Sequence, residues 1–90
     1  MTIQDTLNER QGTHGNYVDQ SILASTVLAS FRSGPNWRHL SPAQEQALIM
    51  MAVKISRILT GDPDHADSWH DIAGYASLVE QTIPKTEGTE

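Results

Sequence analysis

Residues that could bind an anion occur in three short groups along the chain. The first group is Arg10 together with His14, Gly15, Asn16 and Tyr17. Glycine lets a backbone come close to a ligand, and the N–H groups that precede a helix attract anions. This group is therefore a candidate anion-binding site. Short glycine-containing segments also serve as plain connectors between helices, and the sequence leaves that alternative open.

The second group consists of Lys54 and Arg57 in an otherwise apolar segment. Residues three positions apart lie on one face of a helix, so both side chains are predicted to project together. Lysine and arginine are rarely buried without a partner. The pair is therefore expected either to form salt bridges with acids of the next helix or to bind an anion.

The third group combines acids, aromatic residues, a histidine and a glycine in one segment: Asp67, Trp69, His70, Asp71, Gly74 and Tyr75. Helical spacing places the two acids, His70 and Gly74 on one side of a helix, and turns Trp69 and Ile72 toward the core. A glycine inside a helix costs about 1 kcal/mol relative to alanine. Close helix contact or a nearby ligand is expected to compensate at Gly74.

Two interpretations of the second and third groups remain open, and they are compatible. Lys54 or Arg57 could form inter-helix salt bridges with Asp67 or Asp71, or the same residues could bind a ligand. Breaking a buried ion pair costs about 3–5 kcal/mol, so a structural pair would be detected by lost stability. A ligand-binding pair would be detected by lost binding in a protein that still folds.

Helical periodicity dominates the sequence and predicts an all-α fold, a compact bundle of about four helices. The helices are expected at about 2–11, from Tyr17 to the Gly34-Pro35 stop, at 43–60 and from 65 or 66 to 83. Predicted caps are Thr2 with Asp5, Asn16, Ser41 with Gln44, and Asp64 or Asp67. Gly12 to Asn16 is expected to be a loop, and His39 and His65 solvated loop residues. Residues 1–84 are expected to form one domain and 85–90 a flexible tail.

Composition limits the classes of function. A chain of 90 residues buries only a small core, so a homo-oligomer is expected. A net charge of −5, with six Lys or Arg against eleven Asp or Glu, argues against binding to duplex DNA or RNA. The chain has no cysteine for a disulfide or thiolate metal site. It has no export signal or membrane-spanning segment either, so a cytoplasmic protein without membrane partners is expected.

The three groups of residues resemble motifs of a family of small phage and prophage proteins. The motifs are Thr13-His14-Gly15-Asn16-Tyr17, Lys54-Ile55-Ser56-Arg57-Ile58-Leu59 and Asp67-Ser68-Trp69-His70-Asp71-Ile72-Ala73-Gly74-Tyr75-Ala76. Members of that family carry a THGDY-type loop, a K-x-x-R helix and a D-x-W-x-D-I-A-G-Y-A helix. The resemblance covers about residues 7–80. The family is placed near the MazG-like nucleotide pyrophosphohydrolases.

A MazG-like relationship implies an all-helical oligomer that binds a nucleoside triphosphate through Mg²⁺ held by carboxylates. Such enzymes usually place a Glu-Glu-x-x-Glu helix opposite a Glu-x-x-Asp helix. Here the third helix offers only Glu45, followed by Lys54 and Arg57, and the fourth offers Asp67 and Asp71. These two aspartates would be the magnesium ligands of a diverged pyrophosphohydrolase, which is one alternative function. The departure from the pattern argues against hydrolysis, so no catalytic residue and no cofactor are assigned in the preferred interpretation.

The preferred hypothesis is a phage-type protein that binds a nucleotide or cyclic nucleotide. It would sequester a defence signal of the infected or lysogenic bacterial host, in the cytoplasm and without turnover. Lys54 and Arg57 would meet phosphate, and aromatic rings would stack on a base. The expected ligand-binding residues are Arg10, His14, Gly15, Asn16, Tyr17, Lys54, Arg57, Trp69, His70, Asp71 and Tyr75. A purely structural interaction protein, in which these groups form interface salt bridges, is the third alternative.

Overall fold

Residues 2–85, which the computed structural model describes, form four α-helices and one short 3-10 helix. The elements are α1 (Ile3–His14), α2 (Tyr17–Arg32), η1 (Trp37–His39), α3 (Pro42–Thr60) and α4 (Ala66–Thr82). The predicted all-α bundle of four helices is confirmed. Within the described range, none of the helices combines the length and hydropathy needed to cross a membrane. The tail predicted at 85–90 falls, from residue 86 on, outside the described residues.

Three of the predicted helix caps are confirmed. The hydroxyl of Thr2 accepts the Asp5 N–H, and the Asp5 carboxylate accepts the Thr2 N–H in return. Ser41 and Gln44 form the same reciprocal pair at the start of α3. The Asn16 side chain accepts two N–H groups of the first turn of α2. These caps satisfy backbone donors that have no partner inside a helix, so short-range sequence fixes where these helices begin.

One predicted boundary and one predicted cap are wrong. The α1 helix continues through Gly12 to His14, because the backbone hydrogen bonds outweigh the small helix propensity cost of one exposed glycine. Only Gly15 and Asn16 therefore separate α1 from α2. The cap of α4 is His65, which makes no side-chain capping bond, so neither Asp64 nor Asp67 has the predicted capping role.

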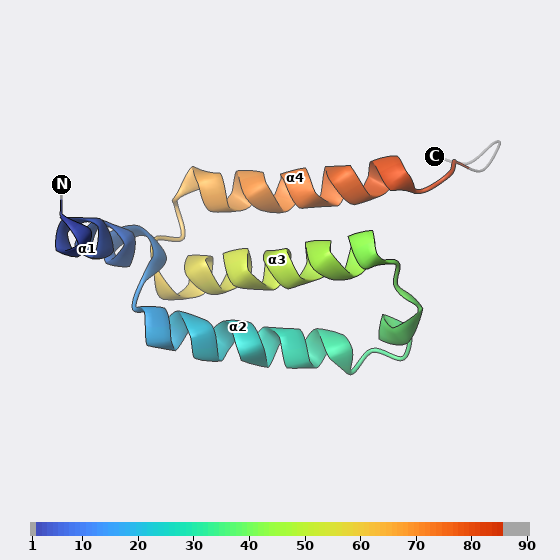
Figure 1. The fold of residues 1–90 in the computed structure, drawn as a ribbon, viewed down its shortest axis with the longest axis horizontal. Coiled ribbons are helices and arrows are strands. Elements are labelled where there is room, and N and C mark those ends of the chain that lie inside the picture. Colours follow the sequence, from blue (N-terminus) through green and yellow to red (C-terminus); the bar gives the residue numbers. More distant parts are fainter. Residues whose placement is uncertain (1, 86–90) are drawn as a thin grey trace.

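The helices α2, α3 and α4 lie side by side in one row, with α3 in the middle (Figure 1). The α1 helix lies across one end of this row, next to the start of α2 and the end of α3 (Figure 1). The central position of α3 agrees with its long apolar sequence, since it packs against a neighbour on each side.

The core is small and lies along α3, the middle helix of the row. Its buried apolar residues, among those described, are Ala47, Ala52 and Ile58 of α3. Ser68, and not the predicted Trp69, is the buried residue at the start of α4. Trp69 is 56% exposed, and its indole N–H donates to the Pro63 carbonyl at 2.8 Å. This hydrogen bond holds the ring over the turn before α4, where it contributes nothing to the predicted core.

Candidate functional site

The positive charge of this acidic chain is concentrated where α1 meets the last turns of α3. Arg10, Lys54 and Arg57 are three of the six Lys and Arg residues in the sequence. The charges of all three lower the pKa of His14, and among them Arg57 and Arg10 have the larger effects. We call Arg10, His14, Lys54 and Arg57 the basic cluster. The structure thus joins two groups that lie about 40 positions apart in the sequence.

The connection between α1 and α2 is fixed against the end of α3, and this contact positions His14. The Thr60 hydroxyl donates to the His14 carbonyl at 3.0 Å, and the Asp62 N–H donates to the Thr13 carbonyl at 3.0 Å. Gly15 has φ +80°, and a Cβ at this position would overlap the Thr60 carbonyl oxygen. Gly15 is therefore required for close packing between two segments of the protein.

The imidazole of His14 is partly buried, and one of its two nitrogens lacks a hydrogen-bond partner among the described residues. Its Nδ1 atom is buried without a partner among the described residues, and its ring meets the edge of the His65 ring at 5.7 Å. Burial lowers the pKa of His14 below its ordinary value of 6.5, and the charges of Arg57 and Arg10 lower it further. His65 lies outside the helices, as predicted, but its side chain is only 30% exposed, so it is less solvated than expected.

Arg57 is a partly buried cation without an ion pair within the part of the chain that the structure covers. Its Nε atom is buried and has no hydrogen-bond partner there. Burial lowers the pKa of Arg57, the charge of Arg10 lowers it further, and Asp71 acts in the opposite direction. Neighbouring like charges are a feature that a bound anion would stabilise.

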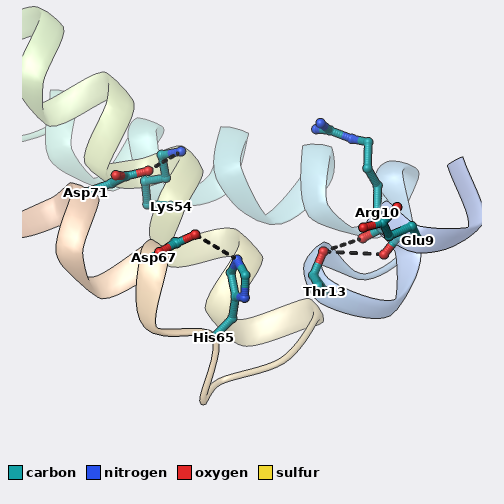
Figure 2. Close-up of polar contacts among 7 residues, drawn as sticks. All are labelled: Glu9, Arg10, Thr13, Lys54, His65, Asp67 and Asp71. Carbon is teal, nitrogen blue, oxygen red and sulfur yellow. Dashed lines mark hydrogen bonds and ion pairs between the residues drawn. The ribbon is translucent and has the colours of Figure 1, made fainter. Parts of the chain in front are cut away.

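The salt bridge predicted between α3 and α4 is confirmed for one pair. Lys54 Nζ lies 2.9 Å from Asp71 Oδ2 (Figure 2), and the Lys54 side chain is only 14% exposed. This hydrogen bond to Lys54 is the main reason why the pKa of Asp71 is lowered. Asp67 instead lies 4.0 Å from the His65 imidazole (Figure 2).

A cavity of about 250 Å³ opens beside the basic cluster, between α1 and the start of α2. We call it the α1–α2 cavity; its lining residues are Leu7, Arg10, Gln11, His14, Gly15, Asn16, Tyr17, Val18 and Gln20. All five residues of the first predicted group are brought together here. Leu7, Gln11, Val18 and the buried Gln20 were not predicted. Because α1 was predicted to end too early, the helical face shared by Leu7, Gln11 and His14 was not recognised.

A second, more open hollow of about 310 Å³ lies on α4 and is lined by His70, Asp71, Gly74, Tyr75 and Leu78. Apart from the neighbouring backbone of its own helix, no atom of residues 2–85 comes within 4 Å of a Cβ placed on Gly74, so no packing contact among these residues compensates for this glycine. Four of the six predicted residues of the third group, His70, Asp71, Gly74 and Tyr75, therefore share this hollow. Trp69 lines neither this hollow nor the α1–α2 cavity.

The carboxylates do not form a suitable site for Mg²⁺. Magnesium requires several oxygen ligands in octahedral array. Of the two candidate ligands, Asp71 is already paired with Lys54, and the Asp67 side chain is exposed beside an imidazole. Across residues 2–85, no three acidic or metal-binding side chains gather closely enough to hold a metal ion. The donor set therefore does not fit the magnesium-dependent alternative.

The salt bridge makes a prediction about acid stability. Because the folded pKa of Asp71 lies below its ordinary value of 3.8, this carboxylate stabilises the fold above that pH. The stabilisation is lost as the pH falls through the folded pKa. Asp71→Asn should therefore lower the melting temperature at pH 7, and its difference from wild type should shrink below pH 3.8. Melting curves from pH 2 to pH 7 test this, with the exposed Asp67→Asn as control. A difference that is independent of pH would contradict it.

Comparison with known proteins shows the family of the chain. A family model described as "Domain of unknown function (DUF6378)" matches residues 3–83. No curated protein has a significant match to the chain. No solved structure matches it significantly either. Because the family model spans nearly all of the sequence, the chain belongs to the DUF6378 family.

Proposed function

We propose that this DUF6378 protein binds a nucleotide through its phosphate groups and sequesters it without chemical turnover. The observation that carries the proposal is the basic cluster, of which Arg10 and His14 line an open cavity, while the charge of Arg57 acts on His14. The neighbouring Asp71 carboxylate already forms an ion pair with Lys54. The other cations of the cluster therefore have no carboxylate of their own to balance their charge within residues 2–85. An anion is the ligand that this arrangement fits best.

Electrostatics favours phosphate over a neutral ligand. Burial is the main reason why the pKa values of His14 and Arg57 are lowered, and the charge of Arg10 lowers both further. A phosphate would replace the repulsion by Arg10 with charge-assisted hydrogen bonds, and arginine forms such bonds in a bidentate manner. It would also raise the pKa of His14, so binding would take up a proton. Affinity is then expected to rise as the pH falls toward 6.5, the ordinary pKa of histidine.

The cavity offers groups for the remainder of a nucleotide. Tyr17 is largely exposed on its wall, where the ring could stack on a base, and Asn16 and Gln11 carry amides that could pair with base edges. Its volume of about 250 Å³ lies just below the about 300–1,000 Å³ of typical ligand sites. One chain therefore holds part of a nucleotide and leaves part of it uncovered.

Sequestration is favoured over hydrolysis because the carboxylates are few and partly engaged. A pyrophosphohydrolase using Asp67 and Asp71 would have to break the Lys54 pair before either metal or substrate could use Asp71. A binder needs no such rearrangement and acts by mass action. The resemblance to phage proteins suggests that the ligand is a cyclic or ADP-ribose-derived defence signal of the bacterial host, an analogy rather than a consequence of the geometry.

Thermal unfolding against a panel of ligands tests the proposal. The panel holds nucleoside mono-, di- and triphosphates, cyclic dinucleotides and ADP-ribose, each with and without Mg²⁺. A ligand at 100 times its Kd adds about 2.7 kcal/mol, and each kcal/mol raises the melting temperature of a chain of this size by about 4–8 °C. A shift that does not need Mg²⁺, followed by recovery of intact ligand after denaturation, is the expected result.

The other outcomes identify the alternatives. Release of pyrophosphate or monophosphate, dependent on Mg²⁺ and abolished by Asp71→Asn in a folded protein, would replace the proposal with the pyrophosphohydrolase. No shift with any ligand would contradict nucleotide binding and leave the basic cluster as part of a structural interaction protein.

A further inference from the structure

The row of three helices leaves the broad faces of the molecule uncovered. Globular domains usually consist of two packed layers of secondary structure, whereas α2, α3 and α4 form one (Figure 1). The radius of gyration is 15.7 Å, compared with about 12 Å expected for a compact domain of 90 residues. The accessible surface is 6637 Å², compared with about 5,200 Å² expected for a monomer of this mass.

Exposed apolar side chains concentrate where α1 and α2 meet. We call this surface the α1–α2 corner; it consists of Ile3, Leu7, Tyr17, Val18 and Ile22, which are 52–77% exposed. Helical spacing of four positions aligns Ile3 with Leu7 and Val18 with Ile22. Leu7, Tyr17 and Val18 also line the α1–α2 cavity, so the apolar surface and the cavity are continuous.

The α1 helix has no buried residue of its own. A helix of 12 residues is marginal in water without tertiary packing, even when its ends are capped. The hydrogen bonds that join α1 to the end of α3 are made at its C-terminal end, by the carbonyls of Thr13 and His14. The apolar residues of its first two turns therefore lack the packing that would keep α1 in place.

We propose that a second copy of this chain docks on the α1–α2 corner, with two-fold symmetry, and covers the cavity beside the basic cluster. The accessible surface of the whole chain exceeds the expectation for a monomer by about 1,400 Å², which is more than the about 800 Å² that each partner contributes to a standard interface. A two-fold interface buries the same patch on both subunits. The second copy supplies the missing layer over α1 and α2. Closing the cavity is the part that rests on the proposed nucleotide binding.

The other largely exposed apolar side chains among residues 2–85 are spread over two helices: Leu59 belongs to α3, Trp69 and Leu78 belong to α4, and Ile83 directly follows α4. The α4 helix lies on the opposite side of α3 from α2 (Figure 1). Leu78 is 60% exposed and Ile22 is 63% exposed, and both lie within helices. These two residues therefore give a matched pair of substitutions, one inside the proposed interface and one outside it.

Sedimentation equilibrium of the ligand-free full-length chain tests the interface. The wild type should have about twice the 9.9 kDa mass of one chain, and Ile22→Glu should reduce it to the mass of one chain. Leu78→Glu should leave the mass unchanged. Circular dichroism checks that each variant is helical, and Ile3→Glu is the second interface variant if Ile22→Glu does not fold. A monomeric wild type, or dissociation by Leu78→Glu alone, would overturn the proposal.

Binding of inorganic pyrophosphate then tests whether the second copy completes the site. Monomeric Ile22→Glu should bind this probe on the order of tenfold more weakly than wild type, since the uncovered cluster stays in high dielectric. Equal affinity in the monomeric variant would show that the site is complete in one chain. If neither the wild type nor any variant binds pyrophosphate and the wild type is dimeric, the proposal of nucleotide binding is contradicted. The proposal of the two-fold interface is then still supported.

Discussion

Gly15→Ala is expected to lower the free energy of unfolding by about 3 kcal/mol or more, because its Cβ has no room. The backbone of Gly15 has φ +80°, which an L side chain rarely adopts, and the new atom would overlap the Thr60 carbonyl oxygen. Relief requires moving backbone, and that movement would break the hydrogen bond from the Thr60 hydroxyl to the His14 carbonyl. The melting temperature should fall by about 12 °C or more.

Gly12→Ala is the matched control for this substitution. Gly12 lies only three positions earlier, inside α1, and apart from the neighbouring helix backbone no atom in the described part of the chain comes within 4 Å of a Cβ placed on it. Alanine there should raise stability by about 0.5–1 kcal/mol, since it reduces the entropy cost of an exposed helical glycine. Urea titrations of the two variants measure both effects. Equal stabilities would mean that the connection between α1 and α2 is not packed against α3.

Arg10→Gln should weaken nucleotide binding by about 10-fold to 100-fold while leaving the fold intact. One hydrogen bond to a charged group contributes about 1.5–3 kcal/mol, and Arg10 lines the cavity with its side chain extending from α1 (Figure 2). Arg10 is exposed, and among residues 2–85 it forms no ion pair. The unfolding free energy of the ligand-free protein should therefore change by less than about 0.5 kcal/mol.

Arg38→Gln provides the control for lost positive charge. Arg38 is also exposed, but it belongs to η1, beyond the other end of α2 from the basic cluster (Figure 1). Isothermal titration with the ligand identified from the panel should give wild-type affinity for Arg38→Gln. Equal weakening by both substitutions would indicate a general charge effect rather than a site at Arg10. Undiminished affinity in Arg10→Gln would place the phosphate elsewhere.

Local interactions determined the helices, and these could be predicted from the sequence. A capping box such as Thr2 with Asp5, or Ser41 with Gln44, acts within three positions, so residue order alone specifies it. The apolar residues of α3 likewise predict a central helix. The spacing of Lys54 and Asp71 on consecutive helices was enough to include their salt bridge among the alternatives.

Tertiary structure decided where α1 ends, which side of α4 is buried, and which charged groups meet. Gly15 and Gly61 look like simple helix stops in the sequence, yet each is needed because two segments cross there without space for a side chain. The hydrogen bond that fixes this crossing joins Thr60 to His14 across 46 positions. Neither helical periodicity nor capping rules act over that distance. The sequence therefore determined the candidate residues and their helices, whereas packing of α1 against α3 decided that Arg10 and His14 lie within reach of the charge of Arg57.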